Sequence, residues 1–249
     1  MFMRLSLGAA AAIMIAGTAV AEDRVFEVKD FTQVEVAEGI VATLREGPFR
    51  VEATARRGDI DRLVIEQDGD VLRIERETPW LQPSLNDRDR FEVDIQMPVL
   101  SRIVSRSGSA VTAAVPVTER FEAQAQSGAS LDIEGVEAEQ SSLRAASGAR
   151  LQFEGAAGQT DVQVQSGATM QLAGNCTDLN ADVRAGARLD AGAFECHTLS
   201  ISARAGASAL GYADQSASVQ ARAGASVRVL GNPATRTTDG GVSASIRFE

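Results

Sequence analysis

Histidine, cysteine and large aromatic residues are scarce in this chain of 249 residues. It contains one histidine, two cysteines, one tryptophan and one tyrosine. Because His197 is the only histidine, any Ser-His-Asp triad or Cys-His pair would have to form around it, and no Gly-x-Ser-x-Gly sequence accompanies it. His197 directly follows Cys196, and adjacent residues of a strand point to opposite faces, which disfavours a shared zinc ion. The sequence therefore predicts no enzyme active site, no metal site and no cofactor.

Positive charge is also scarce. Removing Arg4, which precedes a predicted cleavage site, from the 24 basic side chains leaves 23 against 34 acidic ones, a net charge of −11. A surplus of negative charge repels phosphate backbones, so nucleic acid is excluded as a partner class.

Long apolar runs are missing except near the N-terminus. The run 5–17 follows Arg4 and is shorter than the roughly 20 residues that a membrane-spanning helix needs. Small residues then stand at Ala19 and Ala21, directly before the charged Glu22, which is the pattern of a secretory signal peptide. We therefore expect cleavage between Ala21 and Glu22. The exported product should be soluble in the periplasm or the extracellular space, with no segment that spans a membrane.

Internal repeats are the strongest feature of the sequence. A triplet with a small residue on each side of a glycine recurs seven times, with glycine-to-glycine steps of 20, 20, 19, 19, 20 and 18 residues. Such a fixed period is the signature of a repeat architecture. The triplets are Ser107-Gly108-Ser109, Ser127-Gly128-Ala129, Ser147-Gly148-Ala149, Ser166-Gly167-Ala168, Ala185-Gly186-Ala187, Ala205-Gly206-Ala207 and Ala223-Gly224-Ala225.

Around each glycine, apolar residues alternate with polar ones, which is typical of strands that face a core on one side. Val162 and Val164 precede Gly167, and Met170 and Leu172 follow it. Each period therefore holds two short strands and two turns. Two folds fit this pattern: a parallel solenoid with one coil of about 19 to 20 residues per period, or an antiparallel meander that closes into a sandwich or barrel. We favour the solenoid, because stacked coils select for position-by-position similarity between periods.

The preceding region, 22–100, has no such repeat. We expect an N-terminal β subdomain there that caps the solenoid of residues 101–249, with residues 1–21 as the signal peptide. Alternating apolar residues predict its strands, and the polar, proline-containing stretch 78–90 predicts a long loop. The expected strands span 31–36, 40–45, 49–55, 63–67, 71–76 and 91–96.

Three segments of the chain resemble, in the expected order, the head GIN domain named for auto-transporter adhesins. They are the segment 31–44 with Gly39-Ile40, the segment 93–100 with Pro98, and the Ser-Gly repeats that begin at Ser107. The chain departs from the family pattern at Val41, where asparagine is expected, and in its later Ala-Gly repeats. The resemblance covers nearly the whole exported chain. It implies a secreted or periplasmic protein with a fold like a β-helix. Adhesion is implied only by analogy with the name of the family.

Arginine recurs at one position of the repeat. Arg184, Arg204 and Arg222 each stand two residues before their glycine, as Arg106 does in the first repeat. If the coils stack, the first three form an arginine column that could bind an anionic glycan or a lipid head group. The alternative is that these arginines pair with neighbouring acids such as Asp182, or keep the surface soluble.

Acidic residues occupy several outward positions of the repeats. A hydrolase or lyase would need two carboxylates that converge in a cleft. These acids do not recur at one position of neighbouring periods, which indicates a solvated surface rather than a catalytic pair. They are Asp132, Glu134, Glu154, Asp161, Asp182 and Asp190.

The two cysteines occupy the same position in successive periods. Cys176 stands ten residues before Gly186, and Cys196 stands ten residues before Gly206. In a parallel solenoid their Cα atoms would lie about 4.8 Å apart, within the range that a disulfide tolerates, whereas a meander would separate them by about 9.5 Å. We therefore predict a Cys176–Cys196 disulfide. The alternative is a pair of buried free thiols.

Two classes of function remain open at this point. The first is a non-catalytic binding or adhesin-like module that presents a solenoid face to an envelope or extracellular ligand, such as an anionic glycan, a lipid head group or an envelope protein. The second is a structural or regulatory protein of the cell envelope without a ligand of its own. A carbohydrate-active β-helix enzyme ranks third, and the scarcity of aromatic residues weakens stacking on sugars.

Overall fold

The computed structural model describes residues 22–77 and 89–249. The predicted signal peptide, with Ala19 and Ala21, and most of the predicted loop 78–90 lie outside these residues. In the described part of the chain, no helix has the length and the apolar character needed to cross a membrane.

The described residues form eighteen strands and one short 3-10 helix. The N-terminal elements are β1 (Glu22–Phe26), β2 (Gln33–Val36), β3 (Val41–Glu46), β4 (Arg50–Arg57), η1 (Ile60–Arg62), β5 (Leu63–Asp68), β6 (Val71–Arg76), β7 (Arg90–Met97), β8 (Leu100–Ser105) and β9 (Ala110–Ala114). The later strands are β10 (Val117–Gln126), β11 (Ser130–Ala146), β12 (Arg150–Gln165), β13 (Thr169–Arg184), β14 (Arg188–Arg204), β15 (Ser208–Arg222), β16 (Ser226–Leu230), β17 (Thr235–Gly240) and β18 (Ser245–Phe248).

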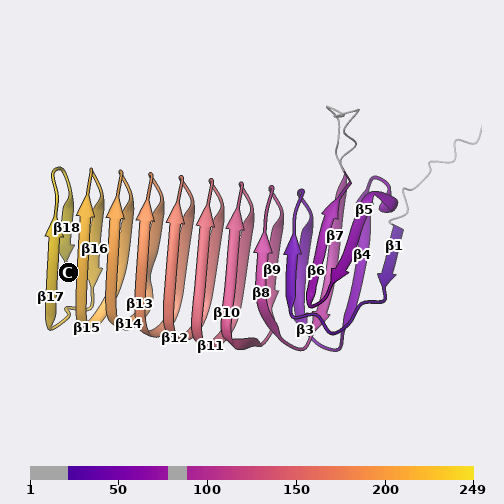
Figure 1. Cartoon of the computed structure of the whole chain (residues 1–249), viewed down its shortest axis with the longest axis horizontal. Coiled ribbons are helices and arrows are strands. Elements are labelled where there is room, and N and C mark those ends of the chain that lie inside the picture. Colours follow the sequence, from indigo (N-terminus) through magenta and orange to yellow (C-terminus); the bar gives the residue numbers. More distant parts are fainter. Residues whose placement is uncertain (1–21, 78–88) are drawn as a thin grey trace, which may run out of the picture.

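The later strands stack as coils of a parallel β-solenoid with two flat sheets (Figure 1). Every pairing among β8 to β18 is parallel, and Leu131, Leu151, Met170 and Leu189 lie side by side on successive coils. This register confirms the solenoid and excludes the meander. We call the sheet with β2, β6, β8, β10, β17 and the second halves of β11 to β15 the front sheet, and the other the back sheet.

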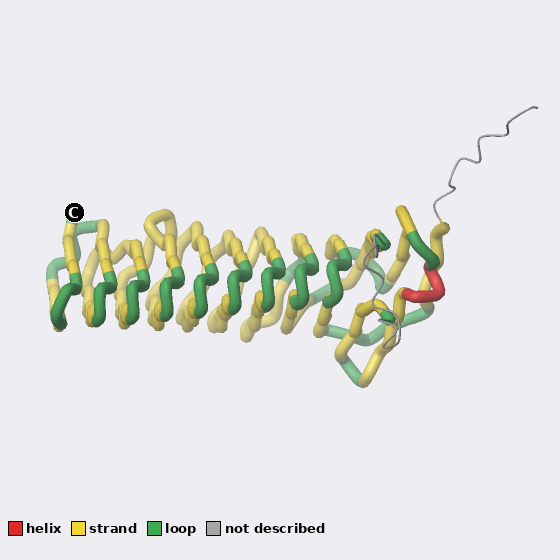
Figure 2. Tube along the Cα trace, turned by 90° about the horizontal axis from the view of Figure 1, so that it is seen from above, coloured by secondary structure: helices red, strands yellow, loops and turns green. Residues whose placement is uncertain are grey.

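The glycine triplets form a row of turns along one edge of the solenoid (Figure 2). In each triplet the serine or alanine and the following glycine both have left-handed backbones, with φ of 51–55° and 71–77°. Glycine adopts this conformation without steric cost, and the residue before it is small. From Gly108 to Gly206, each glycine N–H donates to the carbonyl of the next coil at 2.9–3.1 Å. The turns therefore continue the hydrogen-bonded ladder from coil to coil.

At the opposite edge the chain bends without leaving the ladder. Strands β11 to β15 each run through this edge, and shifts of register, such as the one between Ile133 and Val136, mark the bend. The two sheet strands that the sequence predicts for each coil are therefore joined into one strand of 15 to 17 residues.

The chain order of the coils breaks down at the N-terminal end. The coil formed by β2 and β3 lies between the coil of β6 and β7 and the coil of β8 and β9. Sheets and core thus continue across residue 100. Whether 22–100 and 101–249 are separate folding units stays a prediction.

The two ends of the solenoid are finished differently. At the N-terminal end, β1, β4 and β5 add antiparallel strands that carry many charges. There Arg24 donates a hydrogen bond to Asp61, which raises the pKa of its guanidinium above the ordinary value. At the C-terminal end, the guanidinium of Arg236 lies over the ring of Phe248, with Cζ 4.8 Å from the centroid. This cation–π contact covers the last layer of the core.

The core between the sheets is thin and largely aliphatic, but it includes one unusual pair of hydroxyl groups. Ser141 and Thr160 lie side by side on β11 and β12, are 3% and 0% exposed, and follow Phe121 in the same inward column. Among the described residues, neither hydroxyl has a hydrogen-bond partner. A buried hydroxyl without a partner costs free energy.

Thr160→Val keeps the shape of the side chain and removes this hydroxyl. We expect the variant to raise the free energy of unfolding by about 1 kcal/mol, because valine needs no hydrogen-bond partner. Chemical denaturation of both proteins measures the difference. Thr169→Val, at an outward position of β13, is the matched control, and a lower stability for Thr160→Val would show that the hydroxyl has a partner in solution.

Candidate ligand-binding surface

The predicted arginine column exists on the front sheet. Arg184 lies opposite Arg204, and Arg204 lies opposite Arg222, on β13, β14 and β15. Each guanidinium, however, has a carboxylate nearby. Nη2 of Arg184 and of Arg204 lies 3.5 and 3.3 Å from Asp182, and Nη2 of Arg222 lies 2.6 Å from Asp239. The side chains are about half exposed, so these pairs are weak and remain open to solvent.

A second group of arginines gathers at the N-terminal end of the same sheet, around Glu35. Nη1 of Arg102 and Nη2 of Arg106 lie 2.8 and 2.6 Å from the Glu35 carboxylate, and Nε of Arg73 lies at 3.8 Å. The Glu35 side chain is only 15% exposed. Arg73 also lies 3.4 Å from Asp68, and Arg102 lies 3.4 Å from Glu122, so the arginines of this cluster are distributed over several carboxylates.

Beside this cluster, a groove of about 470 Å³ crosses the outer face of the front sheet. We call it the Arg120 groove. The groove crosses five neighbouring strands. One residue of each strand lies directly opposite the next, in the order Gln33, Arg102, Glu122, Ser142 and Asp161. Four steps between parallel strands make it about 19 Å long. The lining residues are Gln33, Ser101, Arg102, Arg120, Phe121, Glu122, Gln140, Ser141, Ser142, Gln159 and Asp161.

The charged groups in this groove differ in whether they have a partner of opposite charge. Glu122 lies between two arginines, with Nε of Arg102 at 3.4 Å and Nη1 of Arg144 at 3.6 Å. Arg120 donates from Nε to Gln140 at 3.0 Å, and among the residues that the structure describes it pairs with no carboxylate. Asp161 accepts a hydrogen bond from Asn180 at 3.2 Å and has no cation beside it within the described ranges. The groove therefore offers one guanidinium and one carboxylate to a ligand.

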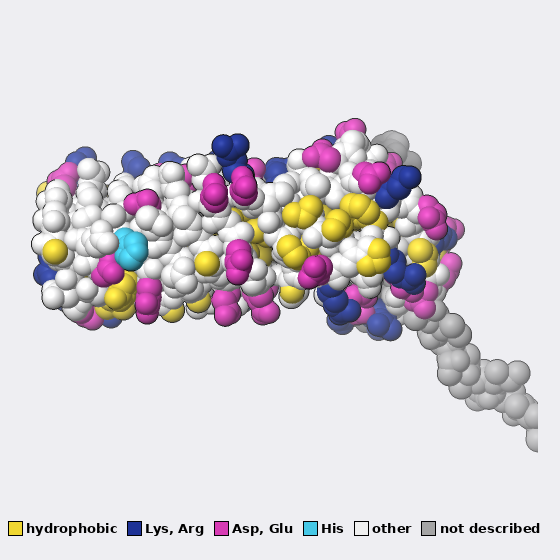
Figure 3. All heavy atoms as spheres, turned by 90° about the horizontal axis from the view of Figure 1, so that it is seen from below, with side chains coloured by type: hydrophobic (Ala, Val, Ile, Leu, Met, Phe, Trp, Pro, Cys, Tyr) yellow, Lys and Arg dark blue, Asp and Glu magenta, His cyan; other side chains and the backbone are white. Residues whose placement is uncertain are grey.

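A larger hollow lies elsewhere, at the edge where the strands bend, and it is acidic. It has about 660 Å³ and is lined by Glu46, Glu134, Glu137 and Glu154, together with the segment 114–117. Figure 3 shows this edge, with acidic side chains over the middle coils. Four carboxylates repel an anion. In the described ranges, no group of three or more histidine, cysteine or acidic residues is placed to hold a metal ion.

This acidic hollow corrects one sequence-based expectation. Glu134 and Glu154 were expected to lie at unrelated positions of the repeat. Their neighbours Ile133 and Phe153 are directly opposite each other in the sheet, so the two glutamates follow in the same register. Glu134 and Glu154 each stand six residues after a triplet glycine, Gly128 and Gly148, so a count along the sequence could also have found this relation. Two of the other acids, Asp132 and Asp190, occupy the same register position but are not adjacent. Gln152 and Gln171 lie between them on the intervening strands.

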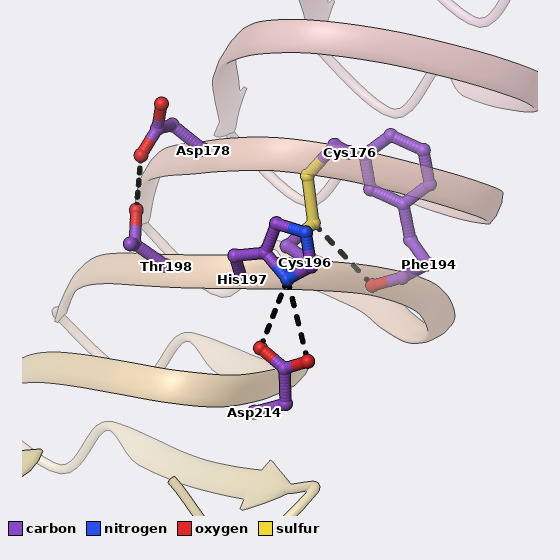
Figure 4. The surroundings of a disulfide bond; sticks show 7 residues. All are labelled: Cys176, Asp178, Phe194, Cys196, His197, Thr198 and Asp214. Atoms are coloured by element: carbon purple, nitrogen blue, oxygen red, sulfur yellow. Dashed lines mark hydrogen bonds and ion pairs between the residues drawn. A yellow bond between two sulfur atoms is a disulfide. The ribbon is translucent and has the colours of Figure 1, made fainter. Parts of the chain in front are cut away.

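Cys176 and Cys196 lie opposite each other at the same edge and form a disulfide, with Cα atoms 4.5 Å apart (Figure 4). Both are inward and buried, at 6% and 1% exposure. His197 points away from the core and lies 3.1 Å from Asp214, from Nδ1 to Oδ1. The structure thus separates the side chains of Cys196 and His197, as the alternation along a strand predicts.

Sequence reasoning found the arginine column but missed the Arg120 groove. Arg102, Arg120 and Glu122 stand at outward positions of β8 and β10, and Arg102 and Glu122 each stand six residues before a triplet glycine. Their proximity to Gln33 depends on the insertion of the β2–β3 coil next to β8. An arginine two residues before a small-Gly-small triplet was visible in the sequence, whereas a contact with an inserted coil was not.

Solved structures with a similar fold include three from Parabacteroides species. The chain resembles a "putative adhesin" of Parabacteroides distasonis with a TM-score of 0.81 and 15% identity, over 92% of this chain and 97% of the other. A "putative adhesin" of Parabacteroides merdae gives 0.79 and 14%, over 94% and 98%. A "putative lipid binding protein" of Parabacteroides distasonis gives 0.72 and 13%, over 94% and 98%. At such identities the likeness shows the fold alone.

No curated protein matches the chain in sequence. A family model does match, over residues 30–233, and its description is "Putative auto-transporter adhesin, head GIN domain". The match spans most of the chain and includes both the β2–β3 coil and all seven glycine triplets. The chain therefore belongs to the head GIN domain family.

Proposed function

We propose that this protein is an exported, non-catalytic binding module whose front sheet takes an anionic ligand of the cell envelope or the extracellular space. The observation that carries the proposal is the arginine column, in which Arg184, Arg204 and Arg222 follow one another on successive coils of the front sheet of an acidic protein. The cluster around Glu35, the Arg120 groove and the arginine column all lie on the front sheet. A guanidinium binds carboxylate and phosphate groups through paired hydrogen bonds, so it suits anionic ligands.

The shape of the molecule supports the same function. A solenoid presents a long, flat surface on which an extended ligand contacts several coils at once. The family and the solved structures carry adhesin names, and one structure is named a lipid-binding protein, which is consistent with a binding role.

Binding by the protein of residues 22–249 tests the proposal directly. We expect it to bind polygalacturonate, or vesicles of phosphatidylglycerol, and to bind dextran and phosphatidylcholine vesicles much more weakly. Binding should weaken as salt is added, because salt screens exposed charges. Equal binding to the charged and the neutral probes, or to none of them, would contradict the proposal.

Charge reversal of the arginine column gives a sharper result. We expect Arg184→Glu, Arg204→Glu and Arg222→Glu together to reduce affinity for an anionic probe by about tenfold or more at low salt, because three attractive charges become repulsive. The fold should persist, since the three side chains are exposed. The same reversal at Arg150, Arg188 and Arg228 on the back sheet is the control. If both triple variants bind alike, the column serves only solubility.

The second candidate is a structural or regulatory envelope protein without a ligand. The observation that favours it is the partial neutralisation of the arginine column by Asp182 and Asp239. Under this alternative, all the probes named above give no binding.

A further inference from the structure

We infer that the Arg120 groove is a subsite for an acidic oligosaccharide, with the guanidinium of Arg120 bound to the carboxylate of one sugar unit. This inference rests on the proposed function and assigns the ligand class at one place on the front sheet. Arg120 supports it most directly, because among the described residues only its Nε donates a hydrogen bond, which leaves its two terminal nitrogens available to a ligand. An exposed guanidinium of this kind forms paired hydrogen bonds with a planar carboxylate.

The rest of the groove suits hydroxyl groups. Three glutamines, Gln33, Gln140 and Gln159, line it on different strands. A primary amide both donates and accepts hydrogen bonds, as a sugar hydroxyl does, so these side chains match a chain of sugar units in polarity. Asp161, held by Asn180, accepts hydrogen bonds only and suits a pair of hydroxyl donors.

The dimensions of the groove favour an oligosaccharide over a single head group. It spans five neighbouring strands, about 19 Å, and its floor contains the small residues Ser101 and Ser142. A lipid phosphate would use Arg102 and Arg120 and would make no use of the remaining hydrogen-bonding capacity of the three glutamines, of which Gln33 donates to Asp70 and Gln140 accepts from Arg120. Exposed aromatic rings do not line the groove, since Phe121 is buried, so recognition depends on charge and hydrogen bonds rather than on ring stacking.

The ligand we would use is an oligogalacturonate of defined length, with its methyl ester as a matched control. The ester has the same rings and lacks the negative charge. Calorimetric titration of the protein of residues 22–249 should show binding of the acid and at least tenfold weaker binding of the ester. Vesicles of phosphatidylglycerol and inorganic phosphate test the other sources of anionic groups. Stronger binding to either than to the oligogalacturonate would overturn the assignment to a sugar acid.

Two variants locate the site. Arg120→Gln should weaken oligogalacturonate binding about tenfold or more, and Ser142→Leu should weaken it by filling the floor of the groove. Arg150→Gln on the back sheet should leave the affinity unchanged. All three positions are on the outer surface, so circular dichroism should show the same fold.

The outcomes separate this inference from the proposed function. If the wild-type protein binds none of the anionic probes, the proposed function fails and the inference fails with it. If the wild-type protein binds oligogalacturonate and Arg120→Gln binds equally well, the proposed function stands and the Arg120 groove is not the site.

Discussion

Leu199→Asp should unfold several coils of the solenoid at once, with a loss of at least about 4 kcal/mol in the free energy of unfolding. Leu199 is 3% exposed, and its register neighbours are Leu179 and Ala217. Across the narrow core it packs against Gly211, whose missing side chain makes room for it: a Cβ there would lie 2.8 Å from Cδ2 of Leu199. A carboxylate at this place would be buried without a partner and would also leave a gap.

The loss should spread along the solenoid, because each coil buries its apolar face only against its neighbours. Thermal unfolding followed by circular dichroism measures it, and limited proteolysis shows which coils open. Ser200→Asp is the matched control, since Ser200 is the next residue of β14 and points outward, and its effect should stay within about 0.5 kcal/mol. Similar melting curves for the two variants would mean that the inward and outward faces are assigned wrongly.

Removal of the Cys176–Cys196 disulfide should cost on the order of 3 kcal/mol. The bond closes a loop with a sequence separation of 20 residues, and a loop of this length loses much of its freedom in the unfolded chain when it is cross-linked. Alanine fits both positions, because the same inward column continues with Ala157 and Ala213. The double variant Cys176→Ala with Cys196→Ala should therefore fold and melt on the order of 10 °C lower.

Reduction provides an independent check of this prediction. Both sulfurs are buried, so a thiol reductant should act slowly on the folded protein and rapidly on the unfolded one. Reduced wild-type protein should then melt near the temperature of the double variant. Two reactive thiols in freshly exported, unfolded protein, with no added reductant, would show that the bond does not form in the cell.

The regular part of the fold could be predicted from the sequence because each coil repeats the same turn residues and the same alternation of apolar and polar residues. The spacing of Gly186 and Gly206 defined successive coils, and the same spacing placed Cys176 opposite Cys196. Alternation placed Leu151 and Leu199 inward, and both are buried. In these coils, neighbours in space are neighbours by one period in sequence, so a simple count is enough.

The irregular part could not be derived in this way. The β2–β3 coil lies between β6–β7 and β8–β9, and nothing in the local pattern of residues 33–46 indicates which coils will flank it. The contacts of Glu35 with Arg102 and Arg106 are separated by 67 and 71 residues in sequence. Gln33 reaches the Arg120 groove through the insertion of the β2–β3 coil, whereas the other strands of the groove follow one another by one period. Strand β1 was not among the predicted strands.

Amide chemical shifts in the presence of oligogalacturonate show whether the front sheet holds an anionic ligand. We expect the largest shifts, saturable and reduced by salt, to map to Arg120, Gln140, Ser142, Gln159 and Asp161, with smaller ones along the arginine column. The methyl ester should leave these resonances nearly unchanged. Shifts confined to the back sheet or to the acidic hollow around Glu134 and Glu154, or no shifts at saturating ligand, would contradict the claim.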